Sequence, residues 1–202
     1  MRRLLPASAA LTLVALVVSV PLAYRSVTST TYRNFRVVES GRLYRSGQMS
    51  EAGLARTLRE YGIRTVVSLR DARDDGKVAP DRAEAEYCAA HGVEHIVLTP
   101  ANWCAADGKP APVEPNLRRF LAVMDDPAKS PVLVHCFAGI HRTGGYVSLY
   151  RIEYGRWTAE EAIREMKGMG TVRTTFDEEI PDYLRAYVRR QDRAPPAAPE
   201  KK

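Results

Sequence analysis

The chain has 202 residues, of which 45% are hydrophobic and 27% are charged, with 30 basic side chains against 24 acidic ones. This composition can build a hydrophobic core, and it excludes a disordered, collagenous or low-complexity protein. Three cysteines are too few, and odd in number, for a small fold held together by disulfide bonds. A net charge of +6 without a long basic run favours small anionic substrates, and we expect no nucleic-acid partner.

Residues 1–26 are predicted to form a hydrophobic helix that anchors the chain in a membrane. Arg2 and Arg3 precede an uncharged run of 21 residues, and about 20 residues suffice to cross a bilayer. The same layout also describes a secretory signal, but Pro21 stands where a small residue is expected before the cut. We therefore expect a membrane-anchored protein with its domain outside the cytoplasm, and secretion after signal cleavage is the alternative.

The rest of the chain is predicted to be one domain between two irregular segments. Residues 27–34 are polar and are interpreted as a spacer, whereas 192–202 are rich in Pro, Ala and charge and are interpreted as a disordered tail. The segment between them, 35–191, is long enough for a single domain.

The predicted elements of this domain alternate between strands and helices. In chain order they are two strands over 35–38 and 43–45, a helix over 51–61, a strand over 65–69, a helix over 80–91, a strand over 95–98, a helix over 113–126, a strand over 131–135, and helices over 142–154, 158–167 and 177–190. This order predicts an α/β fold with a mostly parallel central sheet flanked by helices. Ligands bind such sheets beyond the carboxyl ends of the strands.

The chemically informative residues gather in the segment HCFAGIHRTG, residues 135–144. Cys136 follows an apolar strand, and Arg142 comes six positions later, near the start of a helix. The chain between them must curl tightly, and Gly139 can adopt the backbone angles that a curl needs. Inward N–H groups in such a curl, together with the positive end of the helix dipole, make an anion site. A thiolate at Cys136 would be stabilised there, with Arg142 facing the bound anion and Thr143 donating its hydroxyl to the sulfur.

This segment closely resembles the HC-x5-R-[ST] signature loop of the cysteine-dependent protein tyrosine and dual-specificity phosphatases. The resemblance implies that 35–191 is a phosphatase domain that transfers a phosphoryl group in two steps through a cysteinyl-phosphate, with no cofactor and no metal ion. In this scheme Cys136 is the nucleophile and Arg142 stabilises the phosphate oxygens. The implied substrate-binding residues are Phe137, Ala138, Gly139, Ile140, His141 and Arg142, and the implied supporting residues are His135 and Thr143.

The resemblance also implies a general acid, since family members carry an Asp on a loop about 30 residues before the cysteine. Asp107 lies 29 residues before Cys136, in the loop that follows the strand at 95–98. We expect Asp107 to protonate the leaving group, with Glu114 as the fallback. The alternative is that Asp107 only shapes a turn with Gly108.

Three kinds of function remain open at this stage. A phosphoprotein phosphatase acting on phosphotyrosine, with dual specificity included, comes first. The end of the segment, Gly-x-His-Arg-Thr-Gly, is similar to that of fungal inositol pyrophosphate phosphatases, so an inositol phosphate phosphatase comes second. The absence of Lys within the loop argues against a strongly polyanionic substrate. The third is a phosphate-binding module without catalysis.

Four further residues allow two interpretations each. Trp103 could form a pocket wall or a hinge anchor. Cys104 could form a disulfide bond with Cys136 or have no role of this kind. Cys88 fits buried packing better than chemistry, and Arg70 fits a surface ion pair with Asp71 better than a place at the pocket mouth.

Overall fold

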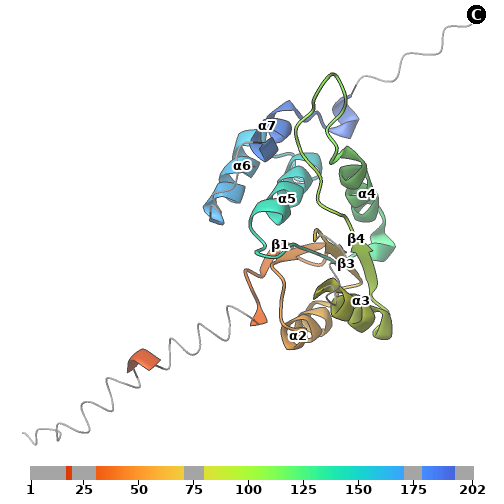
Figure 1. The fold of residues 1–202 in the computed structure, drawn as a ribbon, viewed down its shortest axis with the longest axis vertical. Helices are drawn as coiled ribbons and strands as arrows, with labels where there is room; N and C mark the ends of the chain where they lie inside the picture. The colour runs from red at the N-terminus through yellow and green to blue at the C-terminus, as the bar shows by residue number, and fades with distance from the viewer. Residues whose placement is uncertain (1–16, 20–30, 71–79, 171–178, 194–202) are drawn as a thin grey trace, which may run out of the picture.

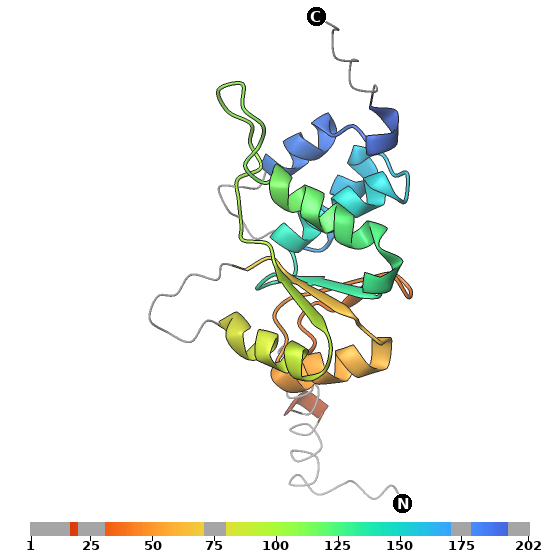
Figure 2. The same cartoon turned by 90° about the vertical axis from the view of Figure 1, so that its right-hand side faces the viewer.

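The computed structural model describes residues 17–19, 31–70, 80–170 and 179–193. Within these ranges the chain forms three layers, with a five-stranded sheet between two groups of helices (Figures 1 and 2). One face is covered by α2 (Glu51–Tyr61) and α3 (Pro80–Ala90). On the other face lie α4 (Glu114–Asp125) and α5 (His141–Glu153), and α6 (Ala159–Gly168) and α7 (Glu179–Ala186) pack against α5.

The sheet is mixed. Its strands are β1 (Arg36–Glu39), β2 (Leu43–Ser46), β3 (Thr65–Ser68), β4 (Glu94–Val97) and β5 (Val132–His135), in the spatial order β1-β2-β5-β3-β4. The pairs β2–β5, β3–β5 and β3–β4 are parallel, whereas β1 pairs with β2 antiparallel. The predicted α/β class is confirmed, and so is a mostly parallel sheet, which the antiparallel β1–β2 edge makes a mixed one. The antiparallel edge arises because Gly41, with φ of 72°, turns the chain back after β1.

Side chains of the central strand β5 point alternately to the two faces of the sheet. Val132 and Val134 belong to the core that includes residues of α4 to α7, whereas Leu133 belongs to the core that includes residues of α2. His135 continues this alternation, and its ring contacts α3. Cys136, one residue beyond the strand, joins the core of α5. The strand therefore sends two adjacent side chains, His135 and Cys136, to opposite sides.

Local signals set the ends of the helices close to their predicted positions. Ser50 caps α2 by accepting a hydrogen bond from the Gly53 N–H, and Gly62 ends the helix in the left-handed conformation. Thr158 and Glu161 form a reciprocal capping box at the start of α6. The helix predicted over 177–190 is shorter, because α7 stops at Ala186 and a separate short 3-10 helix follows over Arg190–Asp192.

The prediction of a membrane-anchored, extracytoplasmic or secreted protein is wrong. Across the described ranges, no helix is long and apolar enough to cross a membrane. Of the predicted N-terminal hydrophobic helix, only residues 17–19 are described, and the rest of 1–26 lies outside these ranges. An apolar run of about 20 residues is necessary for a membrane helix but does not by itself establish one.

The end of the predicted spacer contacts the domain. The Arg33 carbonyl accepts a hydrogen bond from the Gly47 N–H, and Asn34 Nδ2 donates to the Ala138 carbonyl. The predicted tail, 192–202, lies outside the described residues except for its first two positions.

Candidate active site

The site is built where β5 ends and α5 begins. Cys136 is only 4% exposed, and its Sγ accepts a hydrogen bond from the Gly139 N–H at 3.2 Å. The N-cap residue of α5, Ile140, makes no side-chain capping hydrogen bond, so the N–H groups of the first turn have no side-chain cap. The sulfur therefore lies at the positive end of a 13-residue helix, which favours a negative charge.

Two segments flanking the β1–β2 hairpin hold the loop from outside. The Phe137 carbonyl accepts a hydrogen bond from the Gln48 N–H at 2.9 Å. The Ala138 carbonyl accepts one from Asn34 Nδ2 at 2.9 Å. Both carbonyls are thereby fixed away from the interior of the loop.

Arg45 of β2 fixes the next two carbonyls. Its side chain is buried, and Nη2 donates to the Gly139 carbonyl at 2.9 Å and to the Ile140 carbonyl at 3.4 Å. In a trans peptide the N–H points opposite to the preceding C=O. Because the carbonyls of 137–140 are all held outside, the N–H groups of 138–141 point inward. Successive inward N–H groups form a site for an anion.

The loop approaches β2 so closely that glycine is required on both sides. Gly139 has φ of 72°, and a Cβ added there would lie 2.3 Å from the Gly47 nitrogen and 2.4 Å from the Ser46 carbonyl carbon. A Cβ added to Gly47 would in turn lie 2.8 Å from the Ala138 carbonyl carbon. These are backbone atoms, so no side-chain rotation could relieve the contacts.

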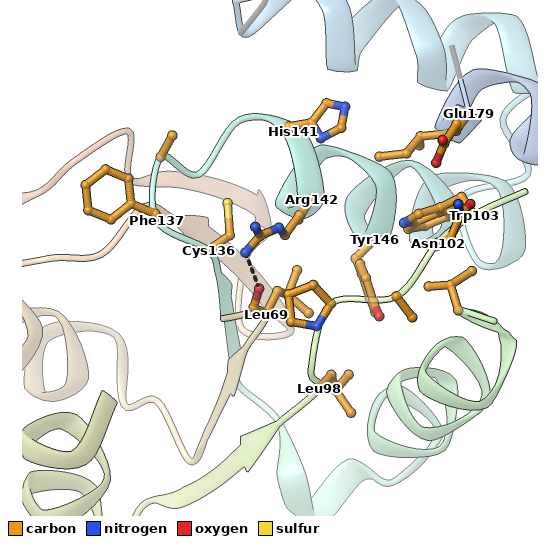
Figure 3. Close-up of a pocket in the computed structure, with 15 residues that line it drawn as sticks. Leu69, Leu98, Asn102, Trp103, Cys136, Phe137, His141, Arg142, Tyr146 and Glu179 are labelled. Carbon is orange, nitrogen blue, oxygen red and sulfur yellow. Dashed lines mark hydrogen bonds between the residues drawn. The ribbon is translucent and has the colours of Figure 1, made fainter. Parts of the chain in front are cut away.

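Arg142 extends from the first turn of α5 toward the carboxyl end of β3. Its Nη1 donates a hydrogen bond to the Leu69 carbonyl at 3.1 Å, and Arg142 lines the same cavity as Cys136 (Figure 3). A guanidinium carries five N–H donors in one plane. The Leu69 contact uses one of them and orients that plane.

A cavity of about 550 Å³ opens above Cys136 and Arg142 (Figure 3). Its walls are mostly apolar, formed by Leu69, Leu98, Trp103, Val113, Tyr146 and Ile180. Trp103 is buried and packs edge-on against Tyr146, which supports the prediction of a pocket wall. The polar groups around the cavity are Asn102, His141, Arg142 and Glu179.

The predicted substrate-binding residues are arranged unevenly around this cavity. Phe137, Ala138, His141 and Arg142 line it, whereas Gly139 and Ile140 are not among its lining residues. Gly139 instead contacts the sulfur through its N–H.

Phe137 forms a rim between two arginines. Its side chain is 54% exposed, with the Arg33 guanidinium 3.9 Å and the Arg70 guanidinium 5.6 Å from the ring centroid. Arg70 also donates a hydrogen bond to Gln48 at 2.9 Å. Asp71, its predicted ion-pair partner, lies outside the described residues.

The supporting residues differ in their contacts. The His135 ring contacts Glu84 on the far side of the sheet. The Thr143 hydroxyl is buried and has no hydrogen-bond partner in the described part of the chain, so the predicted bond to Cys136 is not formed. The Ser46 hydroxyl, from the neighbouring strand, is likewise buried without a partner there.

Neither predicted acid lines the cavity. Asp107 is exposed, with φ of 54°, at the tip of a two-residue turn with Gly108 that is closed by an antiparallel bridge between Ala106 and Lys109. Figure 2 shows this hairpin rising away from the sheet beside the helical layer. Glu114 begins α4 and pairs with Arg118.

The carboxylate that lines the cavity is Glu179, the first residue of α7. Its Oε2 is buried without a hydrogen-bond partner in the described part of the chain.

The three cysteines are all free, so the disulfide bond considered between Cys104 and Cys136 is not formed. Cys88 is buried in the core beside α2, and burial, followed by the charge of Glu84, raises the pKa of its thiol to about 12. In the described ranges, no group of three or more His, Cys, Asp or Glu side chains could hold a metal ion.

The fold is that of the dual-specificity and tyrosine phosphatase class. Yeast PP-IP phosphatase SIW14 from S. cerevisiae, solved with citrate, superposes with a TM-score of 0.58 at 18% identity over 75% of this chain and 85% of that one. TpbA from P. aeruginosa superposes with a TM-score of 0.54 at 26% identity over 73% of this chain and 81% of that one.

Within that class, the family model described as "DSP-PTPase phosphatase fused to NAD+ Kinase" matches residues 19–180, and the chain belongs to this family. The predicted dual-specificity phosphatase family is thereby confirmed. Among curated proteins, "Inositol diphosphatase DSP1" from Oryza sativa subsp. japonica is 32% identical over 133 residues. That match covers 61% of this chain, which spans about half (51%) of the length of the rice protein.

Sequence reasoning missed several residues around the loop, notably Arg45, Glu84 and Glu179. Arg45 carried a usable signal, because an arginine within a predicted strand is rarely buried unless its guanidinium has hydrogen-bond partners. Glu84 and Glu179 lie on helices rich in charge, and the sequence does not distinguish them from solvent-facing neighbours.

Proposed function

We propose that this protein hydrolyses phosphate monoesters through a cysteinyl-phosphate formed on Cys136. The observation that carries the proposal is the cradle of inward N–H groups around the Cys136 sulfur, with Arg142 lining the same cavity. Such a cradle binds a tetrahedral anion directly against the sulfur and stabilises charge on its oxygens.

In the first step the Cys136 thiolate attacks phosphorus. The S–P bond forms as the P–O bond to the alcohol breaks, and a general acid gives a proton to the leaving oxygen. In the second step water attacks the phosphocysteine, releasing phosphate and the thiolate. Arg142 and the N–H groups of 138–141 hold the other phosphate oxygens through both steps.

Asp107 is retained as the proposed acid, and Glu179 becomes the competing candidate because it lines the cavity as the structure stands. Asp107 can serve only if its hairpin folds toward the cavity. The two assignments are separated by Asp107→Asn and Glu179→Gln, each assayed on an aryl phosphate and on an alkyl phosphate. An alkoxide leaves poorly without a proton, whereas a phenolate leaves readily. Replacing the true acid should therefore lower turnover of the alkyl ester about 100-fold or more beyond the loss seen with the aryl ester. Equal losses on both esters would disqualify that residue.

Phosphotyrosine in proteins is the first proposed substrate. The cavity has apolar and aromatic walls, including Trp103 and Tyr146, with the sulfur and the Arg142 guanidinium at its base. This combination suits an aromatic ring that carries a phosphate.

An inositol phosphate is the second proposed substrate, supported by the arginines at the rim. Arg33 and Arg70 both stack on Phe137, and they could pair with phosphates other than the one being cleaved. The similarity to the rice inositol diphosphatase supports the same substrate class.

The decisive experiment is turnover of p-nitrophenyl phosphate by the full chain. Cys136→Ser should abolish turnover, whereas Cys104→Ser, at an exposed cysteine that does not line the cavity, should retain it. No turnover by the wild-type chain, with phosphate still bound, would replace the proposal with a phosphate-binding module. Comparing turnover of a phosphotyrosyl peptide with that of inositol hexakisphosphate then ranks the two substrate classes. Arg33→Ala should weaken turnover of inositol hexakisphosphate and leave that of the peptide unchanged.

A further inference from the structure

A buried carboxylate lies beneath the loop, on the opposite side of the sheet from the cavity. Glu84 of α3 is 6% exposed, and its Oε1 lies 2.7 Å from His135 Nε2 and 3.0 Å from His95 Nε2. Its Oε2 accepts a hydrogen bond from Gln48 Nε2 at 2.9 Å. Burial by itself would raise the pKa of Glu84, but the hydrogen bonds from His135 and His95 outweigh it and lower the pKa to about 2. Glu84 is therefore ionised in the folded protein.

This carboxylate reaches the Cys136 loop by two routes. The first runs through His135, the residue that precedes Cys136. The second runs through Gln48, whose side chain contacts Glu84 and whose backbone N–H holds the Phe137 carbonyl. One buried charge is thus connected, through His135, to the strand end that precedes Cys136 and, through Gln48, to a peptide of the anion cradle.

The contacts of the His135 ring are best satisfied by its cationic form. An ionised carboxylate only accepts hydrogen bonds, so Nε2 must carry a proton toward Glu84. The other nitrogen, Nδ1, lies 3.4 Å from the Cys136 carbonyl oxygen, which also only accepts. A proton on both nitrogens satisfies both acceptors. Glu84 lies at the Nε2 end of the ring and the Cys136 carbonyl at the Nδ1 end, so the ring stands between the buried carboxylate and the peptide of the nucleophile.

We propose that Glu84 is a positioning residue that holds His135 in its cationic form beneath Cys136 and thereby stabilises the thiolate. The inference rests on the proposed function only where it treats that thiolate as the nucleophile. The dependence of Cys136 ionisation on the Glu84 carboxylate can be measured without any substrate.

Other ionisable groups surround this cluster and enter the test. His95 of β4 shares Oε1 with His135, and Arg70 contacts Gln48 from the end of β3. Arg45 of β2 holds the loop from the other side. Cys88, on the same helix as Glu84, has its thiol pKa raised to about 12 by burial and by the charge of Glu84, so it stays neutral. His95 is the neighbour that could compete for a proton, so the charge of His135 must be read directly.

The test is the pH dependence of alkylation at Cys136 in the full chain. Wild type and variants react with iodoacetamide over a pH series, and the tryptic peptide 130–142, in which Cys136 is the sole cysteine, is quantified by mass spectrometry. In Glu84→Gln, His135 loses the carboxylate that retains its proton, and the alkylation midpoint should rise by about one pH unit. Glu86→Gln is the matched control on α3, because Glu86 is exposed and pairs with Arg82, and its midpoint should not move.

The direction of the shift decides the outcome. Removing a nearby negative charge while His135 stays cationic would lower the midpoint, so a lower or unchanged midpoint in Glu84→Gln overturns the proposal. The histidine ring ¹⁵N shifts of the wild-type chain give a second measurement that does not depend on the variant folding. A neutral His135 ring at neutral pH also overturns the proposal. If wild type fails to turn over p-nitrophenyl phosphate but the midpoint still rises in the variant, the proposed function alone is contradicted.

Discussion

Gly139→Ala tests the close approach between the loop and β2. The φ of Gly139 is 72°, and the added methyl carbon would lie 2.3 Å from the Gly47 nitrogen and 2.4 Å from the Ser46 carbonyl carbon. A left-handed backbone costs a non-glycine residue roughly 1–2 kcal/mol. Forcing an extra methyl into packed structure costs roughly a further 1–3 kcal/mol. We expect the free energy of unfolding to fall by about 2–5 kcal/mol, measured by urea denaturation.

Activity should fall with stability, because the loop must move away from β2 and its N–H groups then no longer point together at the phosphate. Turnover of p-nitrophenyl phosphate should drop to the level of Cys136→Ser. Gly41→Ala is the matched control, since Gly41 has the same φ of 72° but nothing within 4 Å of an added Cβ. It should lose only roughly 1–2 kcal/mol and keep full turnover. Equal destabilisation of the two variants, with turnover retained in Gly139→Ala, would refute the close approach.

Three further predictions concern stability. The lowered pKa of Glu84 means that its carboxylate stabilises the fold above pH 4.5, and that about 3 kcal/mol of the free energy of unfolding is lost as the pH falls toward 2. In Glu84→Gln, the free energy of unfolding from urea denaturation should depend less on pH than in wild type, and parallel pH curves for the two proteins would contradict this. Thr158→Ala removes the capping box of α6 and should cost about 1 kcal/mol in thermal or urea unfolding, with no change expected in turnover. Trp103→Ala removes a buried ring packed edge-on against Tyr146 and should cost about 3–5 kcal/mol; a loss under about 1 kcal/mol would show that Trp103 is not a core residue.

Much of the fold could be predicted because its signals are local. The β-branched runs TVVSL and PVLVH correspond to β3 and β5, and the Ser50 and Gly62 signals bound α2 as expected. The order of the strands could not be predicted in the same way. The position of β5 between β2 and β3 depends on packing between segments far apart in the chain.

The site was predictable where one continuous segment supplies it. Cys136, Arg142 and the curl between them follow from ten consecutive residues. For Asp107, the spacing of 29 residues to Cys136 does not say toward which part of the fold the loop carries its side chain. The Asp-Gly pair is itself a turn signal, and both residues adopt the positive φ of such a turn. Glu84 could not be found, because its burial depends on which face of α3 meets the sheet.

The contacts that the β1–β2 hairpin and its flanks make with the Cys136 loop have a consequence for truncated relatives and for fragments. A polypeptide that lost residues 31–47 would still carry the nucleophile and its arginine, and a motif search would count it as intact. It would lack Asn34, Arg45 and Gly47, which shape the peptide groups around the sulfur. Competence in such a fragment should therefore be judged by whether this N-terminal hairpin survives, even though the hairpin supplies none of the reacting atoms.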